Sequence, residues 1–316
     1  MDIKTIDGDL RPFFSVIIPT YNRAKMVVKA INSVQHQTYS DWELIVVDDG
    51  STDNTKETIE IINDNRIKYI YQKNAERSAA RNNGIANAKG NYICFLDSDD
   101  YFLPTRLEGL KRFIDECSEK HALFYTAIIF DKDGVLKERT EVKRGSNTVF
   151  DFVTNAIIGT PQTCIHKALL ESNLFNPSFR IGEDMELWLR IVDKNELIFI
   201  PNQATVIATD HIDRTVNFKQ NNTGIEELKT LKHCFSNQHS GGKISNKIKL
   251  EKISGCLFRA AIYHIYNHNR KMAIYYTFLS LINDLTSRQF LFRLNVLGRL
   301  VTFVNLEKVE KLVYYD

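Results

Sequence analysis

Short apolar runs alternate with amphipathic stretches over the first hundred residues. Strands are predicted over residues 13–19, 44–47, 67–71 and 92–96. Between the runs, apolar residues recur every three or four positions, which predicts helices. These helices are expected over residues 24–34, 53–62 and 78–88. Because such alternation is typical of a parallel sheet covered on both faces, we predict an α/β fold with a mostly parallel, Rossmann-like sheet flanked by helices.

Polar residues follow three of the predicted strands. The groups are Pro19-Thr20-Tyr21-Asn22, Asp48-Asp49 and Asp97-Ser98-Asp99. Ligands of open α/β sheets collect at the carboxyl ends of the strands. We therefore expect these groups, although far apart along the chain, to converge on one crevice.

The segment Asp97-Ser98-Asp99 offers two carboxylates to one side, because residues i and i+2 of an extended chain point the same way. Hard oxygen ligands suit Mg²⁺ or Mn²⁺ bridging to phosphate oxygens. The alternative is an acidic turn that caps a helix near Pro104. The position of the segment directly after an apolar strand favours the metal site.

The segment Asp48-Asp49-Gly50-Ser51 has two interpretations. An ionised carboxylate could accept from the imide of a base or from ribose hydroxyls. Alternatively, Asp49-Gly50 makes a turn and Ser51 caps the next helix. The chain has neither a G-x-G-x-x-G segment after the first strand nor a G-K-[ST] loop, which argues against nicotinamide cofactors and P-loop phosphoryl transfer.

The pattern changes along the rest of the chain. Beyond the fourth strand it predicts a helix over 104–117, an extended stretch over 123–130, a hairpin turn at Asp133-Gly134, a helix over 185–191, and short apolar runs at 197–200 and 204–208. After about residue 217 the spacing is helical throughout. The best linker candidate is Gly241-Gly242, in a polar stretch.

Composition excludes several classes of protein. With 316 residues, 43% hydrophobic and 25% charged, the chain is neither disordered nor a disulfide scaffold. A net charge of +2 does not predict nucleic-acid binding. The five cysteines are scattered without a C-x-x-C pair, and the beginning of the chain lacks a signal-peptide pattern. We therefore expect a soluble, cytoplasmic protein without a membrane-spanning segment.

Positive charge gathers in residues 243–271, where seven Lys and Arg stand against one Glu, a local balance of +6. Apolar residues at helical spacing there, from Ile248 to Tyr266, predict an amphipathic helix. Two interpretations stay open. The helices after residue 217 could form a small bundle that serves as a homodimer surface. They could instead dock on an anionic membrane, peripherally on its inner face, where a lipid-linked acceptor is presented.

Four segments together resemble the family 2 inverting glycosyltransferases of the GT-A fold. They are Phe14 to Arg23, Val46 to Asp53, Ser78 to Gly84 and Lys89 to Asp100. The resemblance covers residues 13–215. It implies a GT-A domain over residues 1–215 and a helical C-terminal appendage over residues 216–316. One departure is Ala75-Glu76-Arg77, where many relatives have a glycine-rich segment.

The resemblance also implies roles for individual residues. Nucleotide contacts are implied for Pro19, Thr20, Tyr21, Asn22, Asp48, Asp49, Arg81, Asp97 and Ser98. Among these, Asp49 is similar to the partner of the uracil imide. Asp97 is similar to the carboxylate that meets the ribose and a metal-bound water.

A second group of implied roles concerns the metal and the diphosphate. Asp99 resembles the direct ligand of Mn²⁺ or Mg²⁺, and His211 resembles a residue near the metal and the diphosphate. Arg214 is implied as a further diphosphate contact. A lone histidine such as His211 is as often an ordinary surface or core residue.

The last implied role is the catalytic base. Asp184 resembles the general base of a Glu-Asp motif, with Glu183 supporting it. Both residues could instead be first-turn acids that interact with the positive end of a helix. The implied reaction moves a sugar from a nucleotide sugar, with a UDP-sugar favoured, to a hydroxyl of a glycan or lipid-linked acceptor in bacterial surface glycan synthesis. The alternatives are a sugar-nucleotide-forming nucleotidyltransferase and a non-catalytic nucleotide-sugar binding module.

Overall fold

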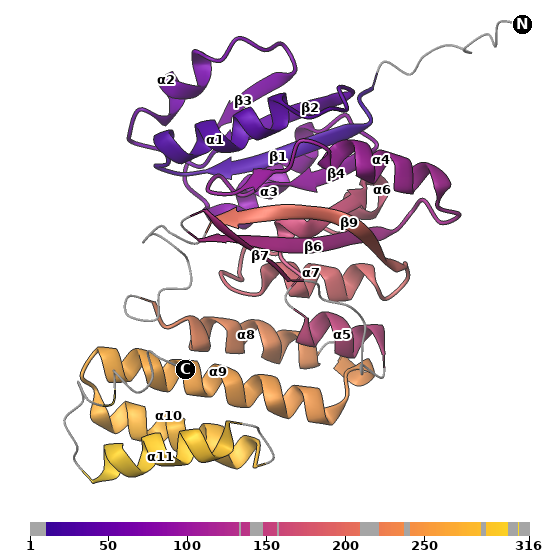
Figure 1. The fold of residues 1–316 in the computed structure, drawn as a ribbon. Coiled ribbons are helices and arrows are strands. Elements are labelled where there is room, and N and C mark those ends of the chain that lie inside the picture. The colour runs from indigo at the N-terminus through magenta and orange to yellow at the C-terminus, as the bar shows by residue number, and fades with distance from the viewer. Residues whose placement is uncertain are drawn as a thin grey trace, which may run out of the picture. The chain divides into compact units, whose positions relative to one another are not determined.

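The computed structural model describes residues 11–132, 134–139, 148–156, 158–208, 221–236, 241–285, 289–302 and 309 (Figure 1). The chain forms two compact units built from interleaved segments. The first, here the sheet unit, comprises residues 1–142, 158–177 and 194–210. The second, the helical unit, comprises residues 143–157, 178–193 and 211–316. Contacts therefore divide the chain at several points, and the functional boundary expected between residues 215 and 216 stays a prediction.

The sheet unit contains one mixed sheet, whose order over the described residues is β3-β2-β1-β4-β8-β6-β9-β5, with β7 paired to β6. Its strands are β1 (Phe14–Thr20), β2 (Trp42–Asp48), β3 (Ile67–Tyr71), β4 (Tyr92–Phe95), β5 (Tyr101–Phe102), β6 (Leu123–Lys132), β7 (Val135–Arg139), β8 (Thr163–His166) and β9 (Leu197–Ala208). The first four strands are parallel, as predicted.

The other half of the sheet departs from the parallel pattern. Strand β8 is antiparallel to both β4 and β6, and β5 is antiparallel to β9. The expected hairpin is present, with Lys132 opposite Val135, and a turn this short requires antiparallel strands. Asp133 itself lies outside the described residues. The two apolar runs expected at 197–200 and 204–208 belong to a single strand, β9, whose pairing with β6 is irregular between them.

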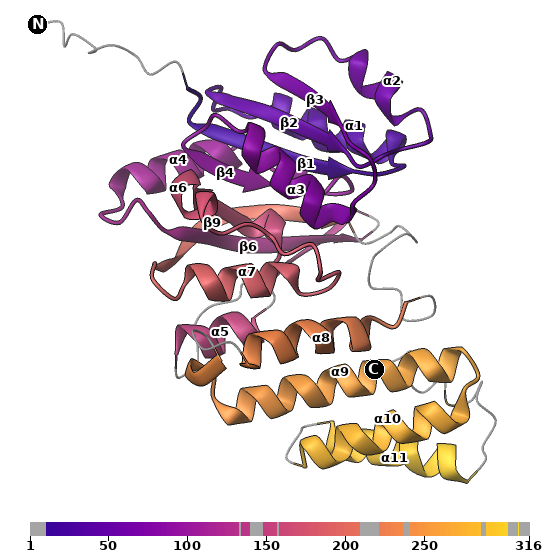
Figure 2. The same ribbon diagram turned by 180° about the vertical axis from the view of Figure 1, so that it is seen from behind.

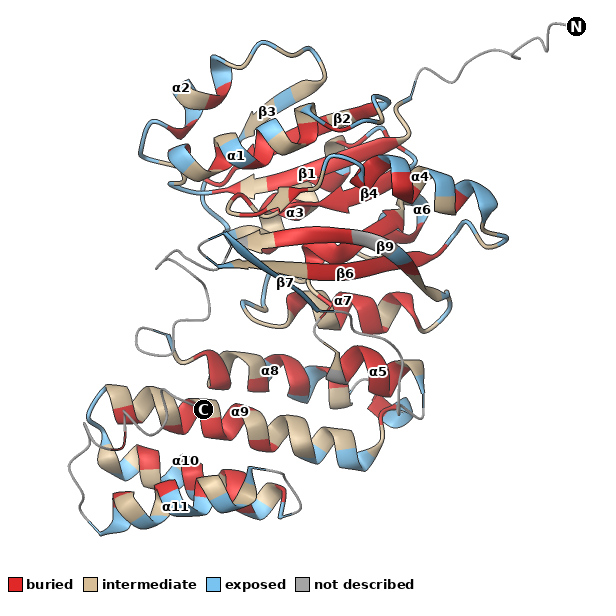
Figure 3. Ribbon diagram, viewed as in Figure 1, coloured by how far each residue is buried: buried red, intermediate tan, exposed pale blue. Residues whose placement is uncertain are grey.

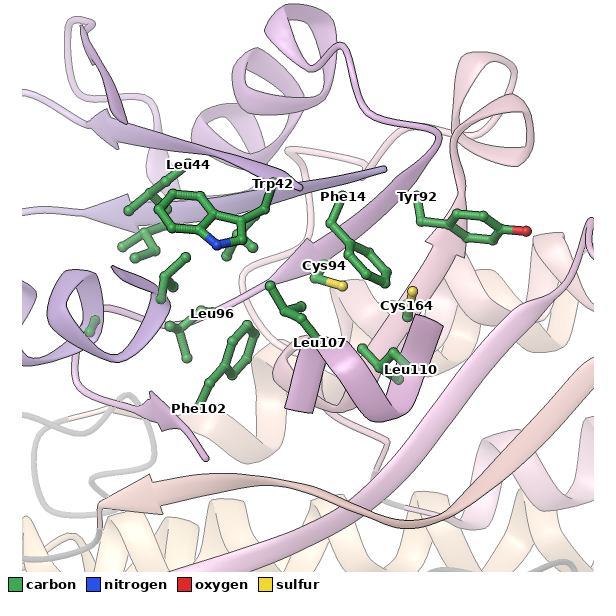
Figure 4. Close-up of a cluster of buried hydrophobic side chains, with 14 of the residues drawn as sticks. Phe14, Trp42, Leu44, Tyr92, Cys94, Leu96, Phe102, Leu107, Leu110 and Cys164 are labelled. Atoms are coloured by element: carbon green, nitrogen blue, oxygen red, sulfur yellow. The ribbon is translucent and has the colours of Figure 1, made fainter. Parts of the chain in front are cut away.

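Helices cover both faces of the parallel strands (Figure 2). The helices of this unit are α1 (Ala24–Gln35), α2 (Thr55–Glu60), α3 (Glu76–Asn87), α4 (Arg106–Glu116) and α6 (Lys167–Glu171), with a short turn η1 (Thr160–Gln162). The first of the two faces carries Phe14, Val16 and Ile18, which pack with α1 and α4 in one buried cluster (Figure 4). Alternate residues of the same strand point to the opposite face, where α3 lies.

Helix α3 lies unusually close to β1. A Cβ added to Gly84 would sit 2.4 Å from a methyl carbon of Ile17, so glycine permits this approach. Asn82 fixes the same helix to a neighbouring segment, because its side-chain amide donates to the carbonyl oxygen of Phe175 (2.8 Å) and its oxygen accepts from the Phe175 amide (2.9 Å). The backbone of α3 is thereby held at a defined distance from the sheet.

The helical unit contains α5 (Val149–Asn155), α7 (Glu183–Ile191), α8 (Thr223–Ser236), η2 (Gly241–Lys243), α9 (Asn246–Tyr266), α10 (Arg270–Asn283) and α11 (Phe290–Val301). Helices without strands after residue 217 agree with the prediction, over the described residues. Gly241, expected in a linker, is buried in η2, where an added Cβ would lie 2.2 Å from the Phe235 carbonyl oxygen. The turn is therefore packed within this unit and does not separate the two units.

Three further observations bear on the sequence predictions. Helix α2 ends at Glu60, so Ile62 lies beyond the helix in which it was expected. All five cysteines are free thiols, as their scattering suggested. Among the described residues, the structure contains no helix that is both long and apolar enough to span a bilayer.

Gly84→Ala should destabilise the protein, because the new methyl group must displace β1 or α3. Overpacking of this kind costs about 1–3 kcal/mol, more than the gain in helix propensity from alanine. Urea unfolding followed by circular dichroism measures the change. Gly298→Ala is the matched control, since an added Cβ there meets nothing within 4 Å and should stabilise α11. Equal effects of the two substitutions would contradict the close approach of α3 to β1.

Candidate active site

The candidate site lies where β1, β2 and β4 end at the same edge of the sheet. Thr20, the last residue of β1, is opposite Asp48, the last residue of β2, and Ile17 is opposite Phe95 at the end of β4. The three polar groups predicted from the sequence therefore follow neighbouring parallel strands. The structure confirms that they lie along one edge.

Asp48 holds the loop after β2 in shape. One carboxylate oxygen accepts from the Ser51 amide (2.8 Å) and the other from the Tyr69 hydroxyl (2.8 Å). Burial and this hydrogen bond raise the pKa of Tyr69 well above its ordinary value. Through these two bonds Asp48 positions the loop after β2, and its predicted contact with a nucleotide stays a prediction.

Asp49 is also buried, with 4% of its surface exposed. Its Oδ1 accepts from Gln72 Nε2 (2.7 Å) and from the Ala75 amide (2.9 Å), while its own amide donates to the Thr20 carbonyl oxygen. All the side-chain bonds that the structure describes for Asp49 use Oδ1. The carboxylate is thus oriented by protein donors and retains acceptor capacity on Oδ2.

The loop after β1 is fastened to the loop after β2. The Asn22 amide donates to Ser51 Oγ (2.8 Å), and Asn22 Oδ1 accepts from the Thr52 amide (2.7 Å). The alternative interpretation, in which Ser51 caps the next helix, is therefore wrong. That helix, α2, begins after Asn54. Gly50 does make the expected turn, with φ +86°. Beside these residues Tyr21 is exposed and offers its ring to solvent.

Two buried hydroxyls near this edge lack hydrogen-bond partners in the described part of the chain. They belong to Thr20, which ends β1, and to Ser78, in the first turns of α3. A buried polar group without a partner costs free energy. The Thr20 hydroxyl can therefore gain from a ligand that brings a donor or an acceptor, which agrees with its predicted place in a nucleotide site.

The two carboxylates after β4 form ion pairs. Asp97 Oδ1 accepts from Arg81 Nη2 at 2.9 Å, and the Asp99 carboxylate lies 2.5 Å from Arg23 Nη1. Arg81, only 2% exposed, extends from α3 with its guanidinium over the Phe175 ring. The sequence analysis placed Arg81 near the nucleotide; the structure shows that it binds a carboxylate of the same edge.

The segment Asp97-Ser98-Asp99 does not cap the next helix, so the alternative interpretation of this segment is wrong. Helix α4 begins at Arg106 with Thr105 at its N-cap. Ser98 between the two acids is buried. Asp97 is partly exposed, with 35% of its side-chain surface accessible, compared with 17% for Asp99. Both acids thus follow β4 at the sheet edge and pair with cationic side chains, and their role as metal ligands stays a prediction.

Glu183 and Asp184 lie in the first turn of α7, in the helical unit. Gly182 precedes them with φ +78°, and Asp184 Oδ1 accepts from the Met185 amide (2.7 Å). Glu183 is buried, whereas Asp184 is partly exposed. The next acid, Glu186, is buried and binds Arg190 through both oxygens (2.8 and 2.9 Å). The location fits first-turn acids at a helix N-terminus, and the role of Asp184 as a base stays a prediction.

Two predicted residues, His211 and Arg214, lie outside the described residues. Within the described residues, no group of three or more His, Cys, Asp and Glu side chains is arranged to hold a metal.

Sequence reasoning missed several participants. Arg23 was quoted in a motif but given no role, although its charge compensates Asp99. Tyr69, which bonds to Asp48, belongs to β3, and Gln72, which bonds to Asp49, directly follows it; the sequence pattern there predicted only a strand. Their polar ends face the adjacent strand, and this pairing order becomes known only once the sheet is assembled.

The comparisons with known proteins agree with this geometry. The family model described as Glycosyl transferase family 2 matches residues 15–168. A glucosyltransferase of Escherichia coli, WfgD, named for UDP-Glc and alpha-D-GlcNAc-diphosphoundecaprenol, is 33% identical over 189 residues, 58% of this chain and 71% of that protein. A Campylobacter jejuni enzyme, named GalNAc(5)-diNAcBac-PP-undecaprenol beta-1,3-glucosyltransferase, is 33% identical over 188 residues, 57% of this chain and 60% of that protein.

Other relatives are much longer than the matched region. An uncharacterized glycosyltransferase of Rickettsia conorii is 39% identical over 187 residues, 58% of this chain but 30% of that protein. Among solved structures, residues 1–349 of TarS from S. aureus, in complex with UDP-GlcNAc, align with a TM-score of 0.61 at 18% identity, over 96% of this chain and 91% of that one.

These comparisons define the class of the protein. The sheet with its flanking helices is a GT-A fold, followed by C-terminal helices. The chain belongs to glycosyl transferase family 2.

The departure at Ala75-Glu76-Arg77 has a structural counterpart. Glu76, at the beginning of α3, has φ +71°, a left-handed conformation that favours glycine and is costly for other residues. It lies directly after Ala75, whose amide orients Asp49. The backbone therefore retains a glycine-like conformation although the residue is glutamate.

Glu76→Gly should stabilise the protein by up to about 1 kcal/mol, because glycine adopts this φ without steric cost. Thermal unfolding measures the change. The control is Arg77→Gly, one residue further into α3, which should destabilise by about 1 kcal/mol because glycine is a poor former of helix interiors. A loss of stability in Glu76→Gly would contradict backbone strain at residue 76.

Proposed function

We propose that this protein is a metal-dependent, inverting glycosyltransferase of the hexosyltransferase class. It would transfer a sugar from a nucleotide sugar, with a UDP-sugar favoured, to a hydroxyl of a glycan or lipid-linked acceptor in bacterial surface glycan synthesis. The observation that carries the proposal is the convergence of Asp49, Asp97 and Asp99 on one sheet edge of a family 2 domain. Each of these carboxylates is oriented by a donor from the protein.

The nucleoside end of the donor would lie against the loops after β1 and β2. Asp49 would accept the imide N–H of uracil, a role that suits a buried carboxylate held through one oxygen. Tyr21 would contribute its exposed ring, and Thr20 its unpartnered hydroxyl. Pro19, Asn22 and Asp48 would set the shape of these loops. This division of labour favours a uridine nucleotide over one whose base lacks an imide.

The diphosphate end would meet the acids after β4. Asp97 and Asp99 provide the hard oxygen donors that Mn²⁺ or Mg²⁺ prefers, and this donor set fits such a cation. A bound cation would supply Lewis-acid stabilisation of the diphosphate leaving group. A mannosyltransferase of Pyrobaculum calidifontis, which shares the fold at a TM-score of 0.57 and 16% identity, was solved with GDP-Man and Mn2+. His211 and Arg214 are proposed as further diphosphate contacts.

The cation would change the charge pairing of the site. Arg23 now neutralises Asp99, and Arg81 neutralises Asp97. We propose that Arg81, buried in α3, holds the Asp97 carboxylate in place, with Ser98 beside it. Arg23 is more accessible, with 22% of its side-chain surface exposed, so it can turn toward the diphosphate when a cation takes Asp99.

The chemical step needs a base for the acceptor. We propose that Asp184 removes the proton from the acceptor hydroxyl, whose oxygen attacks the anomeric carbon from the side opposite the diphosphate. The bond between that carbon and the diphosphate oxygen breaks, and its electron pair leaves with the nucleoside diphosphate. Buried Glu183 would support the base by position. General-base catalysis typically contributes a factor of about 100 to 10,000.

The acceptor class is proposed from the relatives. The Escherichia coli and Campylobacter jejuni proteins are named for undecaprenol-linked substrates, which supports a lipid-linked acceptor here. The alternatives from the sequence are a nucleotidyltransferase and a non-catalytic binding module. The matched family disfavours the first, and the retained Asp97, Asp99 and Asp184 disfavour the second.

A screen of UDP-, GDP- and dTDP-sugars should show hydrolysis or transfer with a UDP-sugar in the presence of Mn²⁺.

Asp184→Asn should retain UDP binding, measured by calorimetry, and lose at least about a hundredfold in turnover, because the amide cannot accept the proton. Glu186→Gln, on the same helix, is the control for damage to α7. Full turnover by Asp184→Asn would remove Asp184 as the base, and inactivity with every nucleotide sugar would refute the proposed function.

Asp99→Ala should abolish the dependence of UDP binding on Mn²⁺, because a carboxylate ligand is lost. Titration of the nucleotide with and without metal checks this. Asp64→Ala removes a carboxylate of similar burial that is paired with Arg66 in the same unit, so it should leave the metal response intact. Equal metal dependence in the wild type and Asp99→Ala would refute the ligand assignment.

A further inference from the structure

Helix α9, predicted as an amphipathic helix that could dock on a membrane, is packed within the helical unit. Helix α9 packs between α8 and α10, and its apolar residues Leu257, Ala261 and Ile265 are buried. Among its basic residues, Lys247 is exposed and Lys249 and Lys252 are partly exposed, whereas Arg259 pairs with Glu227 of α8. An exposed apolar surface has to be sought elsewhere in this unit.

Helices α10 and α11 carry such a surface. Half of the large apolar residues that are exposed in the described part of the chain, seven of fourteen, fall between residues 275 and 301. They are Tyr275, Phe278, Ile282 and Leu285 along and just after α10, and Leu291, Leu294 and Val301 on α11. Their spacings of three, four and seven residues place each set on one side of its helix. Figure 3 shows exposed positions along both helices.

Both sides turn away from α9. Ser254 of α9 donates to the Ser280 carbonyl oxygen of α10 (2.7 Å), and Arg293 of α11 donates to the Ser254 hydroxyl. The rings of Phe258 and Phe292 also meet, with centroids 5.9 Å apart. Since α10 and α11 attach to α9 through their buried sides, the exposed residues form what we term the outer face of the two helices.

The charge of the outer face indicates which kind of partner it fits. Within the described residues 270–285 and 289–302, the acidic side chains are limited to Asp284, which is 8% exposed. Basic residues in the same ranges are Arg270, Lys271 and Arg299, together with Arg293, which is only 5% exposed and bonds inward to Ser254 of α9. Lys271 lies one turn before Tyr275, on the same side of α10, and is exposed. A second copy would bring the same positive charge, whereas an anionic lipid surface complements it.

We propose that the outer face of α10 and α11 docks this protein on an anionic phospholipid bilayer. The seven apolar side chains enter the boundary between headgroups and acyl chains, while the exposed Lys271 contacts lipid phosphates. Helices with an apolar side and basic residues beside it are suited to that boundary, and two signals together give stable binding where one does not. The inference does not depend on the proposed glycosyl transfer.

Flotation of the full-length protein with vesicles tests the proposal, without donor or acceptor present. Vesicles of phosphatidylglycerol and phosphatidylcholine should bind it, and phosphatidylcholine alone should bind it at least about tenfold more weakly. The variant Phe278→Ser, Ile282→Ser and Leu291→Ser should lose at least about tenfold in affinity for the anionic vesicles, since each inserted side chain contributes substantially to partitioning. Lys271→Glu should weaken binding and reduce its salt dependence.

The matched control replaces three exposed apolar residues away from the outer face, namely Ile61→Ser, Val135→Ser and Leu250→Ser. It should bind vesicles like the wild type, and both triple variants should retain their thermal unfolding. Absence of wild-type binding, or equal loss in both triple variants, would overturn the proposal. So would a dimer in sedimentation that the outer-face variant alone abolishes. Nucleotide binding in solution reports separately on the proposed function, so the two can fail independently.

Discussion

The candidate site depends on one electrostatic constraint, which is that carboxylates taken out of water at the end of a sheet must each find donors. Four acids gather there, and the structure satisfies them in different ways. Both carboxylate oxygens of Asp48 accept hydrogen bonds, from Ser51 and Tyr69, whereas the side-chain bonds that the structure describes for Asp49 use Oδ1. Asp97 and Asp99 are balanced by arginines. The four acids therefore differ in their partners, which are hydrogen-bond donors of the loops for Asp48 and Asp49 and arginines for Asp97 and Asp99.

The same constraint explains why α3 matters beyond its packing. It carries Arg81, whose charge balances Asp97, and the Ala75 amide just before it orients Asp49. Its distance from β1 is set by Gly84 and its attachment to the 175 region by Asn82. A shift of this helix would disturb two carboxylates together, so the packing of the sheet unit and the chemistry of its edge are linked.

The helical unit adds a second kind of constraint. Its core is built on α9, a basic helix whose apolar residues pack against α8, α10 and α11. Covering α9 from several sides leaves the last two helices with apolar residues that nothing in the described chain buries. Helix α7, which carries Glu183 and Asp184, belongs to this unit as well. The candidate base and the candidate metal ligands are thus held by different cores.

The sequence by itself determined the first four strands, their helices and the edge on which the site lies, because apolar runs, amphipathic spacing and acidic strand ends are local patterns. It also identified the family through motifs in a fixed order. Tertiary structure alone decided that the sheet becomes mixed after β4, that Arg23 compensates Asp99, and that Tyr69 and Gln72 orient Asp48 and Asp49. It also decided that the outer face lies on α10 and α11, with α9 buried. These features depend on contacts between residues far apart in the chain, and no local pattern encodes which distant side chain will satisfy a buried charge or cover an apolar side.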